Sequence, residues 1–127
     1  MPKAKIILAI VLILVVAAVA FIAVGQSGPG KYDSFAQCLS SSGVKMYGAY
    51  WCPHCNNQKQ LFGSSWKYMD YVECSLPNRA GQTAVCREAG IEAYPTWALP
   101  DGSKMTGELS LQRLAQQSGC ELPAATG

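Results

Sequence analysis

The feature that most restricts the fold of this 127-residue chain is an uninterrupted apolar run at residues 6–24. As a helix, these 19 residues span roughly 28 Å, close to the ~30 Å hydrocarbon core of a bilayer. Lys3 and Lys5 precede the run, and the next charge is Lys31. The positive-inside rule then predicts a cytoplasmic N-terminus, with the rest of the chain on the outer, periplasmic or other extracytoplasmic side. We expect a single-pass cell-membrane anchor over residues 1–25, with a cleaved signal peptide as the alternative.

The remainder of the chain is nearly neutral and suits one small domain. It carries eight Lys/Arg and eight Asp/Glu, so the net charge of +2 comes from the two lysines before the apolar run. Nucleic-acid binders need a basic surface, and we predict no nucleic-acid partner. Residues 26–31 include Gly-Pro-Gly, which does not hold a helix, and are expected to form a short flexible linker. This leaves residues 32–123 as the folded domain and residues 124–127 as a tail.

Helical and strand-like segments alternate through this domain. Helices are expected where capping and turn-forming residues enclose a segment, and strands where β-branched and aromatic residues cluster. The predicted helices cover residues 33–40, 52–62, 82–89 and a segment capped by Ser110, and the predicted strands cover residues 44–50, 71–74, 96–99 and 104–107. This order predicts an α/β fold whose middle strands are parallel and covered on both faces.

All six cysteines follow the apolar run, in the part of the chain predicted to meet an oxidising compartment; they are Cys38, Cys52, Cys55, Cys74, Cys86 and Cys120. An even number in a small exported domain suggests three disulfides, but many pairings are possible and sequence distance does not choose among them. A structural zinc site would want a second ligand pair beside a lone CxxC. We predict no metal and no other cofactor.

The residues expected to carry redox chemistry form a strand-to-helix junction, Trp51-Cys52-Pro53-His54-Cys55. Two cysteines at this spacing can exchange between dithiol and disulfide, and a helix N-terminus favours a thiolate at the first one. We assign Cys52 as the exposed attacking thiol and Cys55 as the buried resolving thiol. His54 could donate a hydrogen bond to the Cys52 thiolate and make the pair a stronger oxidant, or it could be a solvated residue.

This motif, followed by Tyr-Pro-Thr at residues 94–96, resembles the thioredoxin fold. In that family the proline is cis and faces the CxxC, and its neighbouring backbone pairs with the substrate peptide. The resemblance implies these roles for Pro95 and Tyr94. Trp51 and Pro53 flank the attacking thiol, and we expect them to line the same substrate site.

The resemblance is closest to the thioredoxin-like domain fused to bacterial homologues of vitamin K epoxide reductase. It is carried by Phe-Ala-Gln-Cys-Leu at 35–39, residues 46–55, Tyr-Val-Glu-Cys-Ser at 71–75 and Ala-Tyr-Pro-Thr-Trp at 93–97. It implies a thioredoxin-like domain with a mixed sheet of about four strands and helices on both faces, preceded here by one transmembrane helix. The quinone-linked membrane enzyme of those fusions has no counterpart in this sequence. We therefore expect a tethered carrier that a separate quinone-linked membrane partner of that type reoxidises.

The same resemblance implies a structural disulfide between Cys74 and Cys86. A second redox pair that relays electrons to the CxxC stays open as an alternative for these two. Cys38 and Cys120 then remain, and a disulfide between them would link the first and last helices of the domain.

Together these features favour an exported thiol–disulfide oxidoreductase on a membrane tether. We expect it to donate the Cys52–Cys55 disulfide to reduced or misfolded exported proteins. Met46 stands where cytoplasmic thioredoxins usually carry a buried acid that accepts the proton of the resolving thiol. The absence of that acid favours oxidation of substrates over their reduction. Two alternatives stay open: a reductase or isomerase that uses the same dithiol, and a non-enzymatic interaction module with three structural disulfides.

Overall fold

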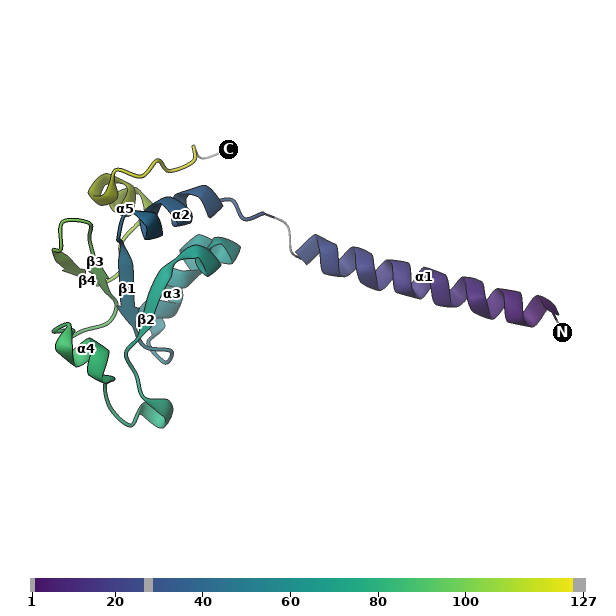
Figure 1. Ribbon diagram of the computed structural model, residues 1–127, viewed down its shortest axis with the longest axis horizontal. Helices are drawn as coiled ribbons and strands as arrows, with labels where there is room; N and C mark the ends of the chain where they lie inside the picture. The colour runs from purple at the N-terminus through teal and green to yellow at the C-terminus, as the bar shows by residue number, and fades with distance from the viewer. Residues whose placement is uncertain (1, 27–28, 125–127) are drawn as a thin grey trace.

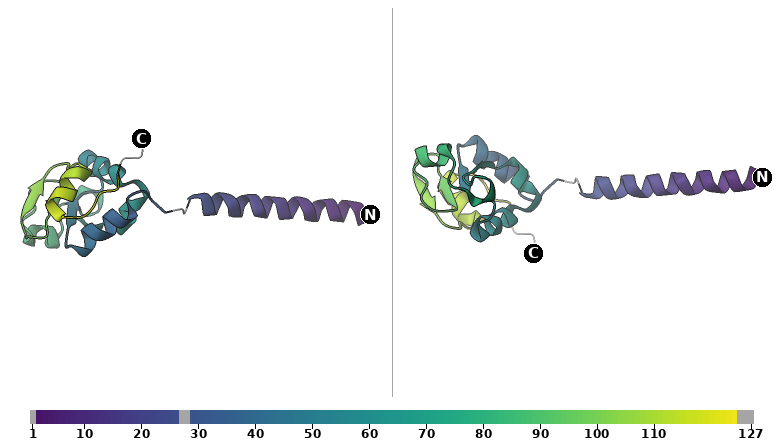
Figure 2. Two further views of the ribbon diagram at one scale, coloured as in Figure 1. Left: turned by 90° about the horizontal axis from the view of Figure 1, so that it is seen from above. Right: turned by 90° about the horizontal axis from the view of Figure 1, so that it is seen from below.

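The computed structural model describes residues 2–26 and 29–124 as the helix α1 and an α/β domain (Figures 1 and 2). Parts of the predicted linker (residues 27–28) and tail (residues 125–127), like residue 1, lie outside the described residues. α1 (Pro2–Gln26) contains a span of 21 residues with a mean hydropathy of 3.2 that is long and apolar enough to cross a membrane. A signal sequence meets the same criterion, so anchor, signal peptide and orientation stay predictions.

The domain alternates between helices and strands as the sequence predicts. Its elements are α2 (Asp33–Ser41), β1 (Lys45–Gly48), α3 (Pro53–Phe62), β2 (Asp70–Glu73), α4 (Ala84–Glu88), β3 (Thr96–Ala98), β4 (Lys104–Thr106) and α5 (Leu111–Ser118), with two 3₁₀ helices, η1 (Gly63–Tyr68) and η2 (Pro77–Arg79), that were not predicted. α4 is shorter than expected because Gln82 forms an isolated β-bridge with Ser75. The helix therefore begins only after Thr83, its N-cap.

The four strands form one mixed sheet in the order β2-β1-β3-β4 (Figure 1). The α/β fold expected from the sequence is confirmed, but β1 is parallel only to β2 and pairs with β3 in the antiparallel direction. The prediction of parallel middle strands is therefore wrong for β1 and β3. The chain enters β3 at the end of the sheet where β1 and β2 finish, so β3 runs in the opposite direction. In the register, Gly48 lies opposite Glu73 and Tyr47 lies opposite Thr96. The carboxyl ends of β1 and β2 thus meet the amino end of β3.

Two hydrophobic clusters cover the two faces of this sheet. The larger one joins buried side chains of α2, α3 and α5 to Met46 and Trp97, which are paired residues on β1 and β3. The smaller one contains Cys86 of α4, and Tyr47 packs against it from the other face of β1. Neighbouring residues of a strand point to opposite faces, so β1 contributes to both clusters.

A buried glutamine attaches α3 to the rest of the domain. Gln58 is fully buried, and its Nε2 donates to the Leu109 carbonyl at 2.8 Å. Its Oε1 accepts hydrogen bonds from the Trp97 indole at 3.2 Å and from the Leu109 N–H at 2.7 Å. These hydrogen bonds offset the free-energy cost of taking the polar atoms of the amide out of water. The helix that carries the CxxC is therefore held against β3 and the segment before α5.

Four cysteines form two disulfides in the pairing expected above. One joins Cys38 of α2 to Cys120 beyond the end of α5, across 82 residues of sequence. The other joins Cys74, which follows β2, to Cys86 of α4, across 12 residues. Cys52 and Cys55 carry free thiols.

Candidate active site

The two free thiols lie at the start of α3, where β1 has just ended. Cys52 is the N-cap with an extended backbone, and its Sγ accepts a hydrogen bond from the Cys55 N–H at 3.4 Å. Pro53 occupies the first turn, where a residue without an N–H costs no hydrogen bond. Gly63 ends the helix at a φ of 56°, a conformation that favours glycine. Local sequence therefore brings both sulfurs to one helix turn.

Both thiols are buried, and this corrects one expectation. Cys52 is 5% exposed, so the attacking thiol is not the open group that the sequence predicts. It packs in the main hydrophobic cluster, with Trp51 and Tyr94 against that cluster. Cys55 is 0% exposed. Cys52 is thus the one residue of the pair with any solvent-exposed surface. This agrees with its assignment as the attacking thiol.

The Cys55 thiol is strongly biased toward its neutral form. Burial raises the pKa of Cys55 from the usual 9.0 to about 12, and the hydrogen bond to Cys52 acts in the same direction. The nearby positive charge of Lys59 opposes this shift. Cys55 therefore holds its proton at neutral pH and has to release it before its sulfur can attack.

The predicted substrate-binding residues surround Cys52. The Cys52 thiol lies 3.8 Å from the Tyr94 carbonyl oxygen, to which it can donate. The Tyr94–Pro95 peptide bond is cis and Pro95 is buried. The Trp51 and Tyr94 rings meet edge to face with centroids 6.0 Å apart. Pro53 is exposed at the beginning of α3.

Trp51 is also held by the segment that follows β2. Its indole N–H donates to the Ser75 hydroxyl at 2.8 Å. The Arg79 guanidinium lies 5.0 Å from the centre of the Trp51 ring, within the range of a cation–π contact. Sequence reasoning missed both Ser75 and Arg79, because their approach depends on how η2 folds back toward the motif.

The imidazole of His54 contacts Glu108, so the predicted hydrogen bond from His54 to the Cys52 thiolate is not formed. Its Nδ1 lies 3.1 Å from Glu108 Oε2, and the side chain is 68% exposed. The hydrogen-bond partners that the structure gives the Cys52 thiol are the Cys55 N–H and the Tyr94 carbonyl. The reason is a carboxylate 54 residues further along the chain, which sequence patterns do not bring near the motif.

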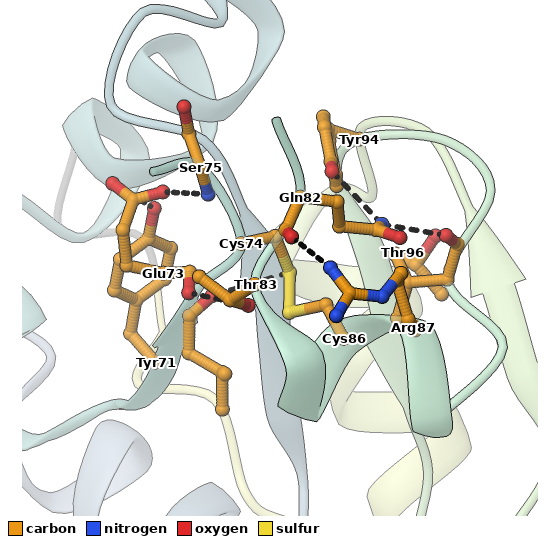
Figure 3. The surroundings of a disulfide bond; sticks show 12 residues. Tyr71, Glu73, Cys74, Ser75, Gln82, Thr83, Cys86, Arg87, Tyr94 and Thr96 are labelled. Atoms are coloured by element: carbon orange, nitrogen blue, oxygen red, sulfur yellow. Dashed lines mark hydrogen bonds between the residues drawn. A yellow bond between two sulfur atoms is a disulfide. The ribbon is translucent and has the colours of Figure 1, made fainter. Parts of the chain in front are cut away.

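The Cys74–Cys86 disulfide lies beside this site and is connected to it by hydrogen bonds (Figure 3). Gln82, from the loop that the disulfide closes, donates through Nε2 to the Tyr94 hydroxyl at 2.9 Å and to the Ile91 carbonyl at 2.7 Å. The disulfide loop thus holds the ring of Tyr94, whose carbonyl faces Cys52. Among the described residues, no group of three or more His, Cys, Asp or Glu side chains is placed to hold a metal ion.

Comparison with known proteins supports a thioredoxin-like interpretation of this domain. No protein-family model matches the chain. Over 96 residues the chain is 41% identical to the thiol-disulfide oxidoreductase LTO1 of Arabidopsis thaliana, and the match covers 72% of this chain. The chain spans about a quarter of that relative's length, since the match covers 25% of it.

Proposed function

We propose that this protein is a thiol–disulfide oxidoreductase that acts at the Cys52–Cys55 pair. The observation that carries the proposal is the position of two free thiols at the start of α3, with the Tyr94 carbonyl 3.8 Å from the first of them. The relative from Arabidopsis thaliana, a thiol-disulfide oxidoreductase, supports the same chemistry.

In this proposal the Cys52–Cys55 disulfide is the oxidant for substrate proteins. A substrate thiolate attacks Sγ of Cys52, the residue of the pair with some exposure, and the Cys52–Cys55 bond breaks. The second thiol of the substrate then attacks the mixed disulfide and displaces Cys52. The N–H of Cys55 donates to Cys52 Sγ, so the leaving sulfur gains a hydrogen bond that favours its negative charge. Substrate gains a disulfide, and both motif cysteines end as thiols.

The cellular setting is part of the proposal. α1 would anchor the domain in the cell membrane with its N-terminus in the cytoplasm, and the substrates would be reduced or misfolded exported proteins. A separate quinone-linked membrane enzyme of the vitamin K epoxide reductase type would reoxidise the pair. The Cys38–Cys120 and Cys74–Cys86 disulfides would be structural, and the site would need neither metal nor other cofactor.

The midpoint potential of the Cys52–Cys55 pair tests this proposal. The full chain in detergent is equilibrated in glutathione buffers, and alkylated thiols are counted by mass spectrometry. We expect two thiols to titrate at about −120 to −180 mV, the range of oxidases and isomerases. A value near about −270 mV would favour a reductase. Resistance of all three disulfides would favour the interaction module.

Disulfide transfer is the direct test of the activity. The oxidised chain is mixed with a reduced, unfolded protein that needs disulfides to fold, and loss of substrate thiols is followed. The wild-type chain is expected to oxidise the substrate in a stoichiometric burst. The Cys52→Ser variant is the matched control and should show no burst.

A further inference from the structure

Cys55 is a thiol whose proton has to move in either direction of the proposed exchange. When a substrate attacks Cys52, Cys55 is the leaving group and departs as a thiolate that needs a proton. When Cys55 attacks a mixed disulfide, it must first lose a proton. Burial favours the neutral thiol, so a nearby group that takes and returns the proton would assist both steps. The position where the resemblance to thioredoxins implies an acid holds the fully buried Met46. A protein group that accepts the Cys55 proton would therefore lie elsewhere in the fold.

Tyr71 of β2 faces Cys55 across the space that Gly48 leaves open. β1 and β2 are parallel neighbours, and Gly48 lies opposite Glu73, two residues after Tyr71. A Cβ atom built on Gly48 would lie 2.9 Å from Cys55 Sγ and 3.1 Å from Tyr71 Cε2. The sulfur and the ring edge next to the phenolic hydroxyl therefore flank the same point. A glycine at this position keeps them from being separated by a side chain.

The Tyr71 hydroxyl is connected to a carboxylate. It donates to Glu73 Oε1 at 3.3 Å, and Glu73 Oε2 accepts the Ser75 N–H at 3.1 Å (Figure 3). Lys59 of α3 places its ammonium 4.0 Å from the centre of the Tyr71 ring. Cys52 and Lys59 act on Cys55 from the α3 side. On β2, Tyr71 is acted on by Glu73, Cys55 and Cys52.

We propose that Tyr71 and Glu73 carry the proton to and from Cys55, in place of the acid missing at Met46. This inference rests on the proposed function and names the groups that serve its second thiol. Glu73 is a positioning residue here, because it acts on Cys55 through the Tyr71 hydroxyl. Lys59 assists by favouring the Cys55 thiolate through its positive charge.

In the proposed path, Tyr71 and Glu73 move the Cys55 proton in both directions of the exchange. When Cys55 resolves a mixed disulfide, its proton passes to the Tyr71 oxygen while the Tyr71 hydroxyl proton passes to the Glu73 carboxylate. Cys55 Sγ then bonds to Cys52 Sγ, and the bond from Cys52 to the substrate sulfur breaks with release of the substrate as a thiolate. The motif pair is oxidised and the substrate sulfur is reduced. The reverse sequence returns the proton to Cys55 as it leaves Cys52.

A two-phase thiol assay isolates the Cys55 step. The full chain in detergent, with Cys52 and Cys55 reduced and the other disulfides intact, is mixed with excess 5,5′-dithiobis(2-nitrobenzoate). Attack by Cys52 releases one coloured thiolate at a rate proportional to the reagent concentration. Attack by Cys55 on the resulting mixed disulfide releases a second, at a rate independent of that concentration. The Cys55→Ser variant, which should release only the first, assigns the phases.

Loss of the proton path should slow only the second phase. Glu73→Gln and Tyr71→Phe are each expected to slow it by about 100-fold at pH 7, the lower end of what general acid–base catalysis contributes. Their second phase should then rise about tenfold per pH unit, because only thiolate formed by solvent reacts. The first phase should match that of the wild type. Glu88→Gln, the same charge change on the exposed surface of α4, is the matched control and should change neither phase.

Two results would count against different parts of this scheme. A second phase that keeps the wild-type rate and pH profile in Glu73→Gln or Tyr71→Phe would overturn the proton path. A wild-type chain that releases only one equivalent of coloured thiolate would refute the proposed function instead, because Cys55 would not resolve the mixed disulfide.

Discussion

Alkaline pH should destabilise the reduced protein through Cys55. The pKa of Cys55 is about 12 in the folded chain and 9.0 for an ordinary cysteine thiol. Between these values the unfolded chain has released a proton that the folded chain keeps. The free energy of unfolding then falls with rising pH, by about 1.4 kcal/mol per pH unit. Below pH 9.0, the pKa of the ordinary thiol, the folded and unfolded chains both hold the proton. There the contribution of Cys55 to the free energy of unfolding is fully present and does not change with pH.

Urea unfolding from pH 8 to 10.5 measures this effect. The full chain in detergent is kept under mild reduction that opens only the Cys52–Cys55 pair, and unfolding is followed by tryptophan fluorescence. Cys55→Ala is the matched variant, because it keeps every other titrating group, including Tyr71, whose pKa burial also raises. The difference in unfolding free energy between wild type and variant should be constant up to about pH 9 and then shrink by about 1.4 kcal/mol per pH unit.

The oxidised wild type is a second control, since its Cys55 cannot titrate. It should lack the additional alkaline loss of stability seen in the reduced form. Parallel pH profiles for the reduced wild type and Cys55→Ala above pH 9 would refute the reasoning, because burial would then not hold the proton on this sulfur. The same result would remove the need for a proton acceptor in the exchange reaction.

Three further outcomes are expected in equilibrium unfolding of the full chain. Gln58→Leu leaves three buried polar groups without partners and should lower stability by about 3 kcal/mol or more; Gln60→Leu, on the exposed side of α3, should cost far less, and equal losses would contradict the Gln58 network. Gly48→Ala puts a methyl group into contact with the resolving thiol and should cost about 1–3 kcal/mol through overpacking, whereas unchanged stability would show that this space is not filled. Replacing both Cys38 and Cys120 by Ala frees a loop of 82 residues and should lower stability by about 4 kcal/mol in the chain-entropy view; a loss below about 1 kcal/mol would show that this disulfide constrains the unfolded chain little.

The short-range features of the site could be predicted because their causes lie within a few residues. Cys52 caps α3, Pro53 starts it and Gly63 ends it, as the residue types favour. The same holds for Ser110, whose hydroxyl accepts the Arg113 N–H at the start of α5. Each depends on backbone sterics or on one hydrogen bond across a single turn.

The surroundings of the thiols could not be predicted in this way. The position of Tyr71 near Cys55 depends on the parallel register of β1 and β2, which places Met46 opposite Tyr71 and Gly48 opposite Glu73. A shift of one residue would turn these side chains to the other face. The burial of Cys52 and the contact of His54 with Glu108 likewise depend on segments that are far apart in the sequence.

The sequence by itself determined the elements of this protein and the place of its reactive pair, namely an apolar N-terminal helix, an α/β domain and a CxxC at the start of a helix. Tertiary structure alone decided the direction of β3, how little of Cys52 is exposed and the approach of Tyr71 to Cys55. The physical reason is the range of the interactions. Helix ends and turns are set by neighbouring residues, whereas the environment of a buried sulfur is set by strand register and by packing between distant segments.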